Sequence, residues 1–395
     1  MFDLTPNDYD FLAPRHIVFG WGRWREVGPL AAGLGRRALV VLGSRTLERN
    51  GMVSELHDEL RDHRVEPVAL ATISREPTVE DVDAVIARAC ELSPAAGDFV
   101  LALGGGSALD LGKAVAALAT NREGSSVRDY LEGVGRGLKL SAAPLPVLAM
   151  PTTAGTGSEA TKNAVISVHS PAVKKSLRDP RLVPSVVLVD SQLGVSLPSS
   201  TTAHTGMDAI TQLIESYISR RAKPIPQALA LQGVRMALPA IERAVEDGAC
   251  REAREAMAHA ALLSGMALAN SGLGMAHGVA AALGVHCEVA HGLACAVMLP
   301  LALRANRDAC QPQLAQLAAA VSLADGRTES EAAEAFIEHV EQIAHRIGIP
   351  RQLRAIGVDR NQIGDLVRDS KGNSMNGNPR TLADEELAGL LDAQW

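Results

Sequence analysis

Four polar side chains in the second half of the chain are of the types that can bind a divalent metal ion: Asp208, Gln212, His277 and His291. A helix through Asp208 and Gln212 would place both on one face, one turn apart. Imidazole and carboxylate groups are usual ligands for a divalent transition metal, whereas a side-chain amide is a weak one. The pattern predicts a metal site at Asp208 and leaves open how tightly it holds the ion.

One further histidine, His204, precedes Asp208 by four residues. If the helix already runs through position 204, His204 shares the face of Asp208 and Gln212 and could supply an additional imidazole. The alternative is an exposed residue near the start of the helix. We favour the exposed position and keep the first as an open hypothesis.

A glycine-rich turn between a predicted strand and a predicted helix has the composition of a phosphate-binding loop: Gly104, Gly105, Gly106 and Ser107. Without Cβ atoms the backbone can approach a phosphate, and the helix N-terminus directs amide hydrogens at the anion. The turn lacks G-x-G-x-x-G spacing and follows the third apolar run of the chain, which argues against a standard Rossmann domain. A plain strand-to-helix connection is the alternative.

A second loop, between positions 151 and 159, gathers hydroxyl groups and glycines after another apolar run. Such a loop can contact a ribose and a nicotinamide through hydroxyl and amide groups, although an ordinary turn rich in serine and threonine would look similar. The candidate cofactor-binding residues in it are Thr152, Thr153, Thr156 and Ser158.

The elements that must position these residues change near position 190. Before it, short apolar runs at 38–43, 68–71, 99–104, 145–150 and 186–190 alternate with helical patterns, as expected of parallel strands buried on both faces. After it, alanine, leucine, glutamate, arginine and methionine recur at helical spacing. We expect an α/β domain over 1–192 and an all-helical domain over 193–395, since 395 residues exceed one ordinary core.

Composition narrows the class of protein. A formal charge of −7 offers no basic surface for nucleic acid. The first six residues lack a secretory signal, so we expect a cytoplasmic protein. The uncharged stretch between Glu255 and Glu288 is interrupted by polar residues and glycines, which favours core helices over a membrane span. Five cysteines without a C-x-x-C are expected to be mostly buried, small apolar residues.

Four ordered motifs make the chain resemble the iron-containing (group III) alcohol dehydrogenases. They are Gly104 to Ser107 with Asp110 and Lys113, the loop 151–159, the segment 205–215, and 274–278 with His291-Gly292. The resemblance extends from about Ile17 to Arg380. It implies a dehydroquinate synthase-like fold, with an N-terminal dinucleotide-binding α/β domain, an all-helical domain that holds the metal, and a homodimer or larger homo-oligomer.

The resemblance also implies roles for individual residues. Asp208, His277 and His291 match three metal ligands of the family, while Gln212 stands where the family has a fourth ligand, a histidine. Ala281 replaces a further family histidine near the substrate, and we assign His286 to part of that space as a catalytic residue. Lys174 matches a family lysine near the nucleotide, although a solvated surface lysine is an alternative. Asp110 is counted among the cofactor-binding residues.

The choice of cofactor depends on the segment after the first predicted strand. Relatives that prefer NAD carry an aspartate there, which hydrogen-bonds the adenosine ribose. This chain has Ser44 followed by Arg45, which can hydrogen-bond and charge-pair with a 2′-phosphate. We therefore favour NADP(H) over NAD(H), with a surface arginine on a turn as the alternative.

The predicted function is a metal-dependent alcohol dehydrogenase or aldehyde reductase that uses Fe²⁺ or Zn²⁺ and acts on a small alcohol or aldehyde. Three alternatives stay open: a metal-free enzyme like the maleylacetate reductases, a dehydroquinate synthase-like lyase, and a non-catalytic nucleotide-binding protein. The lyase is disfavoured because 265–299 contains no lysine or arginine to bind a phosphorylated acid.

Overall fold

The computed structural model describes residues 8–170 and 172–395. The first six residues, on which the prediction about a secretory signal rests, lie outside this part. The chain forms two compact units. One comprises 14–202 and 246–262, and the other comprises the described residues 8–13 together with 203–245 and 263–395.

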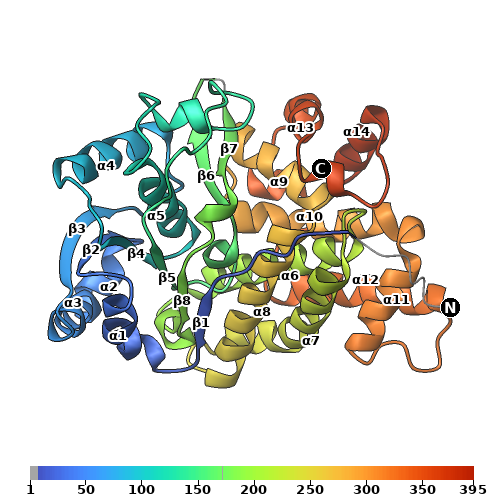
Figure 1. Cartoon of the computed structure of the whole chain (residues 1–395). Coiled ribbons are helices and arrows are strands. Elements are labelled where there is room, and N and C mark those ends of the chain that lie inside the picture. The colour runs from blue at the N-terminus through green and yellow to red at the C-terminus, as the bar shows by residue number, and fades with distance from the viewer. Residues whose placement is uncertain (1–7, 171) are drawn as a thin grey trace. The chain divides into compact units, whose positions relative to one another are not determined.

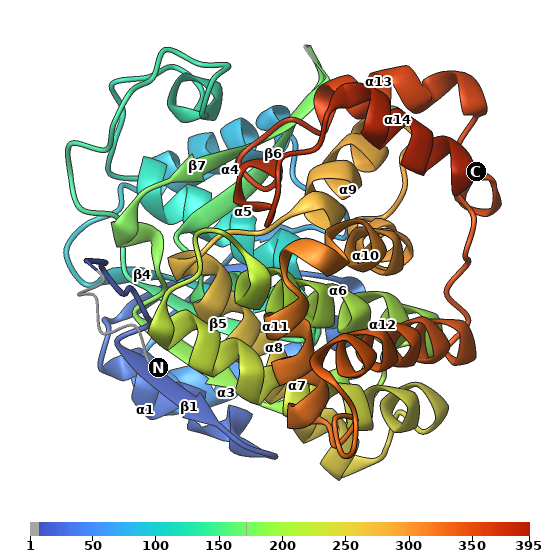
Figure 2. The same cartoon turned by 90° about the vertical axis from the view of Figure 1, so that its right-hand side faces the viewer.

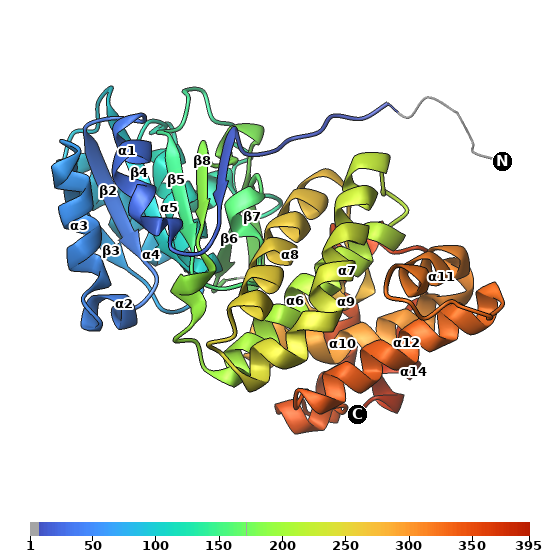
Figure 3. The same ribbon diagram turned by 90° about the horizontal axis from the view of Figure 1, so that it is seen from below.

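The first unit contains a six-stranded sheet in which every neighbouring pair is parallel. The strands lie in the order β3-β2-β4-β5-β8-β1. Figure 3 shows this sheet from below. Their bounds are β1 His16–Phe19, β2 Arg37–Leu42, β3 Glu66–Thr72, β4 Asp98–Gly104, β5 Val147–Pro151 and β8 Val186–Val189. The parallel α/β sheet predicted from the apolar runs is confirmed, and β1 is an additional edge strand.

Helices cover both faces of this sheet, which explains why its central strands are apolar without alternation. Val40 and Leu42 pack with helices α1 (Val27–Ala32), α2 (Arg45–Arg49) and α3 (Met52–Asp62). Val41, on the opposite face, packs with helices α4 (Val79–Glu91) and α5 (Gly106–Leu118).

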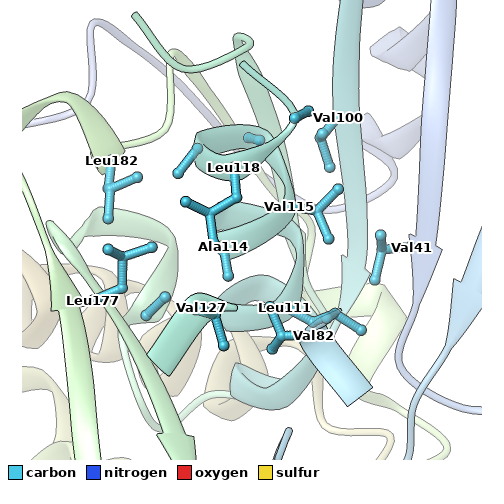
Figure 4. Packing of buried hydrophobic residues seen from close by; sticks show 14 of the residues in the cluster. Val41, Val82, Val100, Leu111, Ala114, Val115, Leu118, Val127, Leu177 and Leu182 are labelled. Carbon is cyan, nitrogen blue, oxygen red and sulfur yellow. The ribbon is translucent and has the colours of Figure 1, made fainter. Parts of the chain in front are cut away.

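Helix α5 is buried on nearly all sides because an antiparallel hairpin, β6 (Asn163–Val168) with β7 (Val173–Arg178), covers it. Figure 4 shows Val115 of α5 near Val41 and Val100 of the sheet, with Leu177 of the hairpin on the other side of the helix. The hairpin was not predicted, because β7 alternates weakly and carries two lysines. The glycine-rich turn therefore opens a helix that is fixed from two sides.

The second unit is helical, as predicted, and Figures 1 and 2 show its helices in yellow-green to red. Helix α9 packs against α10, and α11 packs against α12. The bounds of the helices that build this half of the chain are α6 Ser199–Ile218, α7 Pro224–Glu246, α8 Arg251–Asn270, α9 Met275–His286, α10 His291–Asn306, α11 Gln311–Ala320, α12 Glu329–Arg346, α13 Ile363–Asp369 and α14 Asp384–Ala393.

The uncharged stretch noted in the sequence forms the end of α8 and all of α9. Among the described residues, no single helix has the length and apolar character needed to cross a membrane. Helices α8 and α9 reach that length and composition only as a pair, and they are bent by 97° with respect to each other.

Candidate functional site

Helix α6 presents Asp208, Gln212 and Glu215 from one face, because these residues are four and seven positions apart. All three are buried, with 1%, 3% and 3% of their surface exposed. The helix begins at Ser199 and runs through His204, which is the condition under which His204 would share a face with Asp208 and Gln212. Helix α6 therefore carries a row of polar groups into the interior of the second unit.

Four side chains that could bind a metal ion lie close together: Asp208 on α6, His277 at the start of α9, and His291 and Cys295 on α10. One potential ligand atom from each lies within 4.8 Å of every other. Asp208 Oδ1 is 3.3 Å from His277 Nε2 and 3.8 Å from His291 Nε2. The structure thus brings together three of the four predicted metal ligands.

Two of these atoms, Asp208 Oδ1 and His277 Nε2, are buried and have no hydrogen-bond partner among the described residues. An unpaired buried polar atom costs about 1–3 kcal/mol, so two such atoms facing each other call for a shared partner. A cation between them satisfies both lone pairs. His291 leaves 34% of its side chain exposed, which keeps the cluster accessible from outside. The donor set therefore fits a divalent transition metal.

Glu215 fixes the orientation of His277. Its Oε2 is 2.7 Å from His277 Nδ1, and its Oε1 accepts a 2.7 Å hydrogen bond from the backbone N–H of Ala276. Donation by Nδ1–H to the carboxylate leaves Nε2, on the Asp208 side, as the nitrogen with a free lone pair. The sequence reasoning gave Glu215 no role, although its spacing of seven from Asp208 was available as a signal.

Gly274 permits this arrangement at the beginning of α9. A Cβ atom there would lie 2.8 Å from Glu215 Oε1 and 3.0 Å from Asn378 Oδ1, closer than side chains tolerate. Asn378 Oδ1 accepts a 3.0 Å hydrogen bond from the Met275 N–H. The first amides of α9 are thus bound by two side chains, and the carboxylate of Glu215 complements the positive end of the helix dipole.

The electrostatics of the cluster favour positive charge. Burial opposes the charged form of Asp208, yet His291 and His277 hold the pKa of its carboxyl below the ordinary value. Burial would lower the pKa of His277, but Cys295, Asp208 and Glu215 together raise it well above the usual range. Cys295 is the main cause that raises the pKa of His291 to about 9. A divalent cation would supply the positive charge that these groups favour.

Cys295 was missed by the sequence reasoning, which treated the cysteines as apolar residues. It is fully buried, and its Sγ lies 3.7 Å from His291 Nε2. The available signal was its spacing of four from His291, which puts both side chains on one face of α10.

Three other predicted residues have different surroundings. Gln212 Oε1 accepts a 2.8 Å hydrogen bond from Ser264 Oγ. His286 Nε2 is 2.7 Å from Asp369 Oδ2, so that imidazole nitrogen is engaged by a carboxylate. His204 is half-buried, and burial lowers its pKa. Neither His204 nor His286 belongs to the cluster of four potential metal ligands around Asp208.

In the first unit, the predicted cofactor residues follow neighbouring strands. Gly104 is the last residue of β4 and Gly105 to Ser107 lead into α5, while Ser44 follows β2 and Thr152 follows β5. The sheet order reverses between β2 and β4, and such a switch point is where open α/β sheets bind ligands at the carboxyl ends of their strands. The glycine turn lies at this switch point although it follows the third apolar run of the chain and not the first.

The glycine turn and the hydroxyl-rich loop lie against each other. A Cβ atom on Gly106 would be 2.8 Å from Thr156 Oγ1, and one on Gly105 would be 3.3 Å from Thr153 Cγ2. Gly104 in turn approaches Gly43, where a Cβ atom would be 2.7 Å from the Cα of Gly104. The close approach explains the need for glycine and brings the two predicted loops together.

A buried lysine connects the two loops. Lys113 Nζ donates to Ser158 Oγ at 2.7 Å and to the Ser158 carbonyl at 2.9 Å, and it is 3.0 Å from Asp110 Oδ1. Ser158 Oγ donates to Asp110 as well. Burial lowers the pKa of Lys113 and raises that of neighbouring Glu159 to about 7. The side chains of Asp110 and Ser158, predicted to bind the cofactor, are thus engaged in holding the loops.

Two further predicted cofactor residues differ in their environment. Ser44 caps α2 by accepting a hydrogen bond from the Thr46 N–H, and the adjacent Arg45 is exposed. Lys174, on β7, makes a 2.6 Å ion pair with Glu76 Oε2, which gives it a partner within the protein.

Comparisons with known proteins cover nearly the whole chain. Residues 14–191 match the family model for iron-containing alcohol dehydrogenase, and residues 202–395 match the model for the C-terminal part of the Fe-containing alcohol dehydrogenase family. An NADPH-dependent butanol dehydrogenase from Clostridium saccharobutylicum is 30% identical over 98% of this chain and 97% of its own length.

Two further similarities agree with these matches. An NAD-dependent methanol dehydrogenase from Bacillus methanolicus is 30% identical over 97% of this chain and 98% of its own length. The crystal structure of a 1,3-propanediol oxidoreductase superposes with a TM-score of 0.91 at 31% identity, covering 98% of this chain and 100% of that one.

Proposed function

We propose an assignment of the metal and cofactor sites from one premise: the chain belongs to the iron-containing alcohol dehydrogenase family, whose two models match residues 14–191 and 202–395. It is an alcohol dehydrogenase and aldehyde reductase that depends on a divalent metal. The proposal is that Asp208, His277 and His291 bind this metal and that the loops after β2, β4 and β5 bind NAD(P)(H).

The observation that carries the metal assignment is the pair of buried atoms without hydrogen-bond partners, Asp208 Oδ1 and His277 Nε2, at 3.3 Å from each other. Other buried polar atoms also lack partners among the described residues, but these two belong to ionisable groups that face each other, and one cation between them would satisfy both. A metal-free mechanism of the maleylacetate reductase type gives this cluster no role, and the relatives named above are alcohol dehydrogenases.

A divalent metal bound there supplies a Lewis acid that polarises the oxygen of the alcohol or aldehyde. Glu215 keeps His277 Nε2 directed at the ion through its hydrogen bond to Nδ1, and Asp208 compensates part of the positive charge. The backbone N–H groups of the glycine turn would bind the pyrophosphate of the cofactor. The nicotinamide held by these loops would supply the hydride acceptor or donor at C4, and in the oxidation direction the hydroxyl proton would leave to solvent.

The finer cofactor proposal is a preference for NADP(H). It is supported by Ser44 and the exposed Arg45, whose guanidinium has no hydrogen bond to another described side chain and can pair with a 2′-phosphate. Relatives of both cofactor types exist, so the family alone does not decide. A cytoplasmic location and a homodimeric or larger assembly stay predictions, the latter to be measured by light scattering.

Metal analysis of gently purified protein tests the proposal. We expect about one Fe²⁺ or Zn²⁺ per chain, loss of aldehyde reduction with NADPH after chelation, and recovery when either ion is added back. Asp208→Asn should abolish stoichiometric metal binding while far-ultraviolet circular dichroism stays unchanged. Full activity in protein shown to contain no metal would overturn the assignment.

A further inference from the structure

Cys295 lies beside the three proposed ligands Asp208, His277 and His291, and the proposed metal site gives it no role so far. It is fully buried, and its sulfur belongs to the group of four atoms that all lie within 4.8 Å of one another. A buried cysteine ordinarily packs as a small apolar residue among apolar neighbours. Here the thiol instead faces two imidazoles and a carboxylate, and two atoms of these groups have no hydrogen-bond partner in the described part of the chain.

Three separations within the cluster are close to those expected of tetrahedral coordination. With metal distances of about 2.0–2.1 Å to nitrogen or oxygen and about 2.3 Å to sulfur, tetrahedral ligand atoms are about 3.4 Å apart for an N/O pair and about 3.6 Å for an N/S pair. The corresponding distances are 3.3 Å for Asp208 Oδ1 to His277 Nε2, 3.8 Å for Asp208 Oδ1 to His291 Nε2, and 3.7 Å for Cys295 Sγ to His291 Nε2.

The local structure of α10 gives Cys295 this place. His291 is the first residue of the helix and Cys295 lies one turn later, so both side chains project from the same face. Gln212, in contrast, already accepts a hydrogen bond from Ser264 through the oxygen that would bind a metal, and an amide is the weaker ligand. The buried setting also favours anionic ligands, because a thiolate and a carboxylate together balance a divalent charge.

We propose that Cys295 binds the metal as a thiolate and completes the set Asp208, His277 and His291, so that the sulfur replaces the imidazole missing at position 212. The inference rests on the proposed metal site. Metal binding releases the thiol proton to solvent and forms one metal–sulfur bond, with no change of oxidation state. A thiolate also moves the preference of the site towards Zn²⁺ and away from hard ions such as Mn²⁺.

Cobalt substitution tests the ligand directly, because a thiolate bound to Co²⁺ gives a charge-transfer band in the near ultraviolet that nitrogen and oxygen ligands do not give. The variants are Cys295→Ala and Cys295→Ser. The matched control is Cys310→Ala, which removes another buried thiol of the same unit, one that donates to the Asn306 carbonyl. Wild type and the control should show the band, and both Cys295 variants should bind Co²⁺ without it.

The affinity readout accompanies the spectra. We expect Cys295→Ala to raise the Kd for Zn²⁺ at least about 100-fold, because loss of a direct ligand should cost no less than the 10–100-fold typical of outer hydrogen-bond partners. If either variant misfolds, zinc X-ray absorption of the wild type still decides, since it should show one sulfur neighbour at about 2.3 Å.

The possible failures are distinguishable. Stoichiometric Co²⁺ or Zn²⁺ binding by the wild type with no thiolate band and no sulfur neighbour overturns the role of Cys295 and leaves the three-ligand site intact. Absence of metal binding by the wild type overturns the proposed metal site itself and the role of Cys295 with it.

Discussion

Glu215→Gln is expected to weaken metal binding although Glu215 is not itself a ligand. The carboxylate accepts 2.7 Å hydrogen bonds from His277 Nδ1 and from the Ala276 N–H, and it lies 3.4 Å from the His277 N–H. Glutamine keeps the shape but has only one accepting oxygen, so its NH₂ group must face a donor. Losing one charge-assisted hydrogen bond costs about 1.5–3 kcal/mol.

That free energy can be compared with metal affinity. At about 1.4 kcal/mol per factor of ten, it corresponds to a Kd raised roughly 10–150-fold if the whole loss falls on the metal-bound state. The range agrees with the about 10–100-fold effects seen when outer partners of metal-binding histidines are removed. Competition with a chromophoric chelator measures the Kd for Zn²⁺, and urea unfolding of metal-free protein measures the part that falls on stability.

The control for this variant is Glu386→Gln, which removes the charge of an exposed carboxylate paired with Arg380 in the same unit. Its metal Kd should equal that of the wild type. A Glu215→Gln protein with a Kd within twofold of wild type, together with lowered stability of the metal-free state, would refute the reasoning and reduce Glu215 to a cap of α9.

Three further changes test other parts of the structure. Gln212→His should tighten Zn²⁺ binding because it restores an imidazole, and chelator competition measures the Kd. In a Cys295→Ala background the same change should recover about tenfold or more of the lost affinity. An unchanged Kd in both backgrounds would place position 212 outside the coordination shell. Ser44→Asp should repel the 2′-phosphate and so lower the ratio of kcat/KM with NADPH to kcat/KM with NADH at least about tenfold. The control Ser44→Ala should change this ratio little. Equal changes in both variants would contradict the assignment of Ser44 to the cofactor site. Burial raises the pKa of Glu159 to about 7 from 4.5, so the folded state holds this proton more firmly than the unfolded state, and the stability contributed by the protonated form is lost as pH rises from about 4.5 through about 7. That loss is up to about 3 kcal/mol in urea unfolding, and Glu159→Gln should remove it; a variant with the pH dependence of the wild type would show that Glu159 titrates normally.

The sequence predicted those parts of the first unit that depend on local pattern. Strands such as β4 are buried on both faces, so an uninterrupted apolar run identifies them. The hairpin of β6 and β7 was beyond this reasoning, because β7 carries Lys174 and Lys175 and its assignment depends on packing against α5. Local pattern therefore identified the strands that a continuous core defines, and missed the elements whose burial depends on tertiary contacts.

The candidate metal site shows the same limit at the level of single residues. Asp208 and His277 were predicted as ligands because motifs mark them, whereas Cys295 comes close to them through the packing of α10 against α9. A spacing of four on one helix places Cys295 beside His291, but no spacing relates α10 to α6, which lies far away in the sequence. Gln212, which departs from the family pattern, lies on α6, whereas Cys295, the candidate ligand in its place, lies on α10. A Cys295→Ala variant that loses metal affinity and a double variant with Gln212→His that regains it would show that the two positions supply one ligand between them.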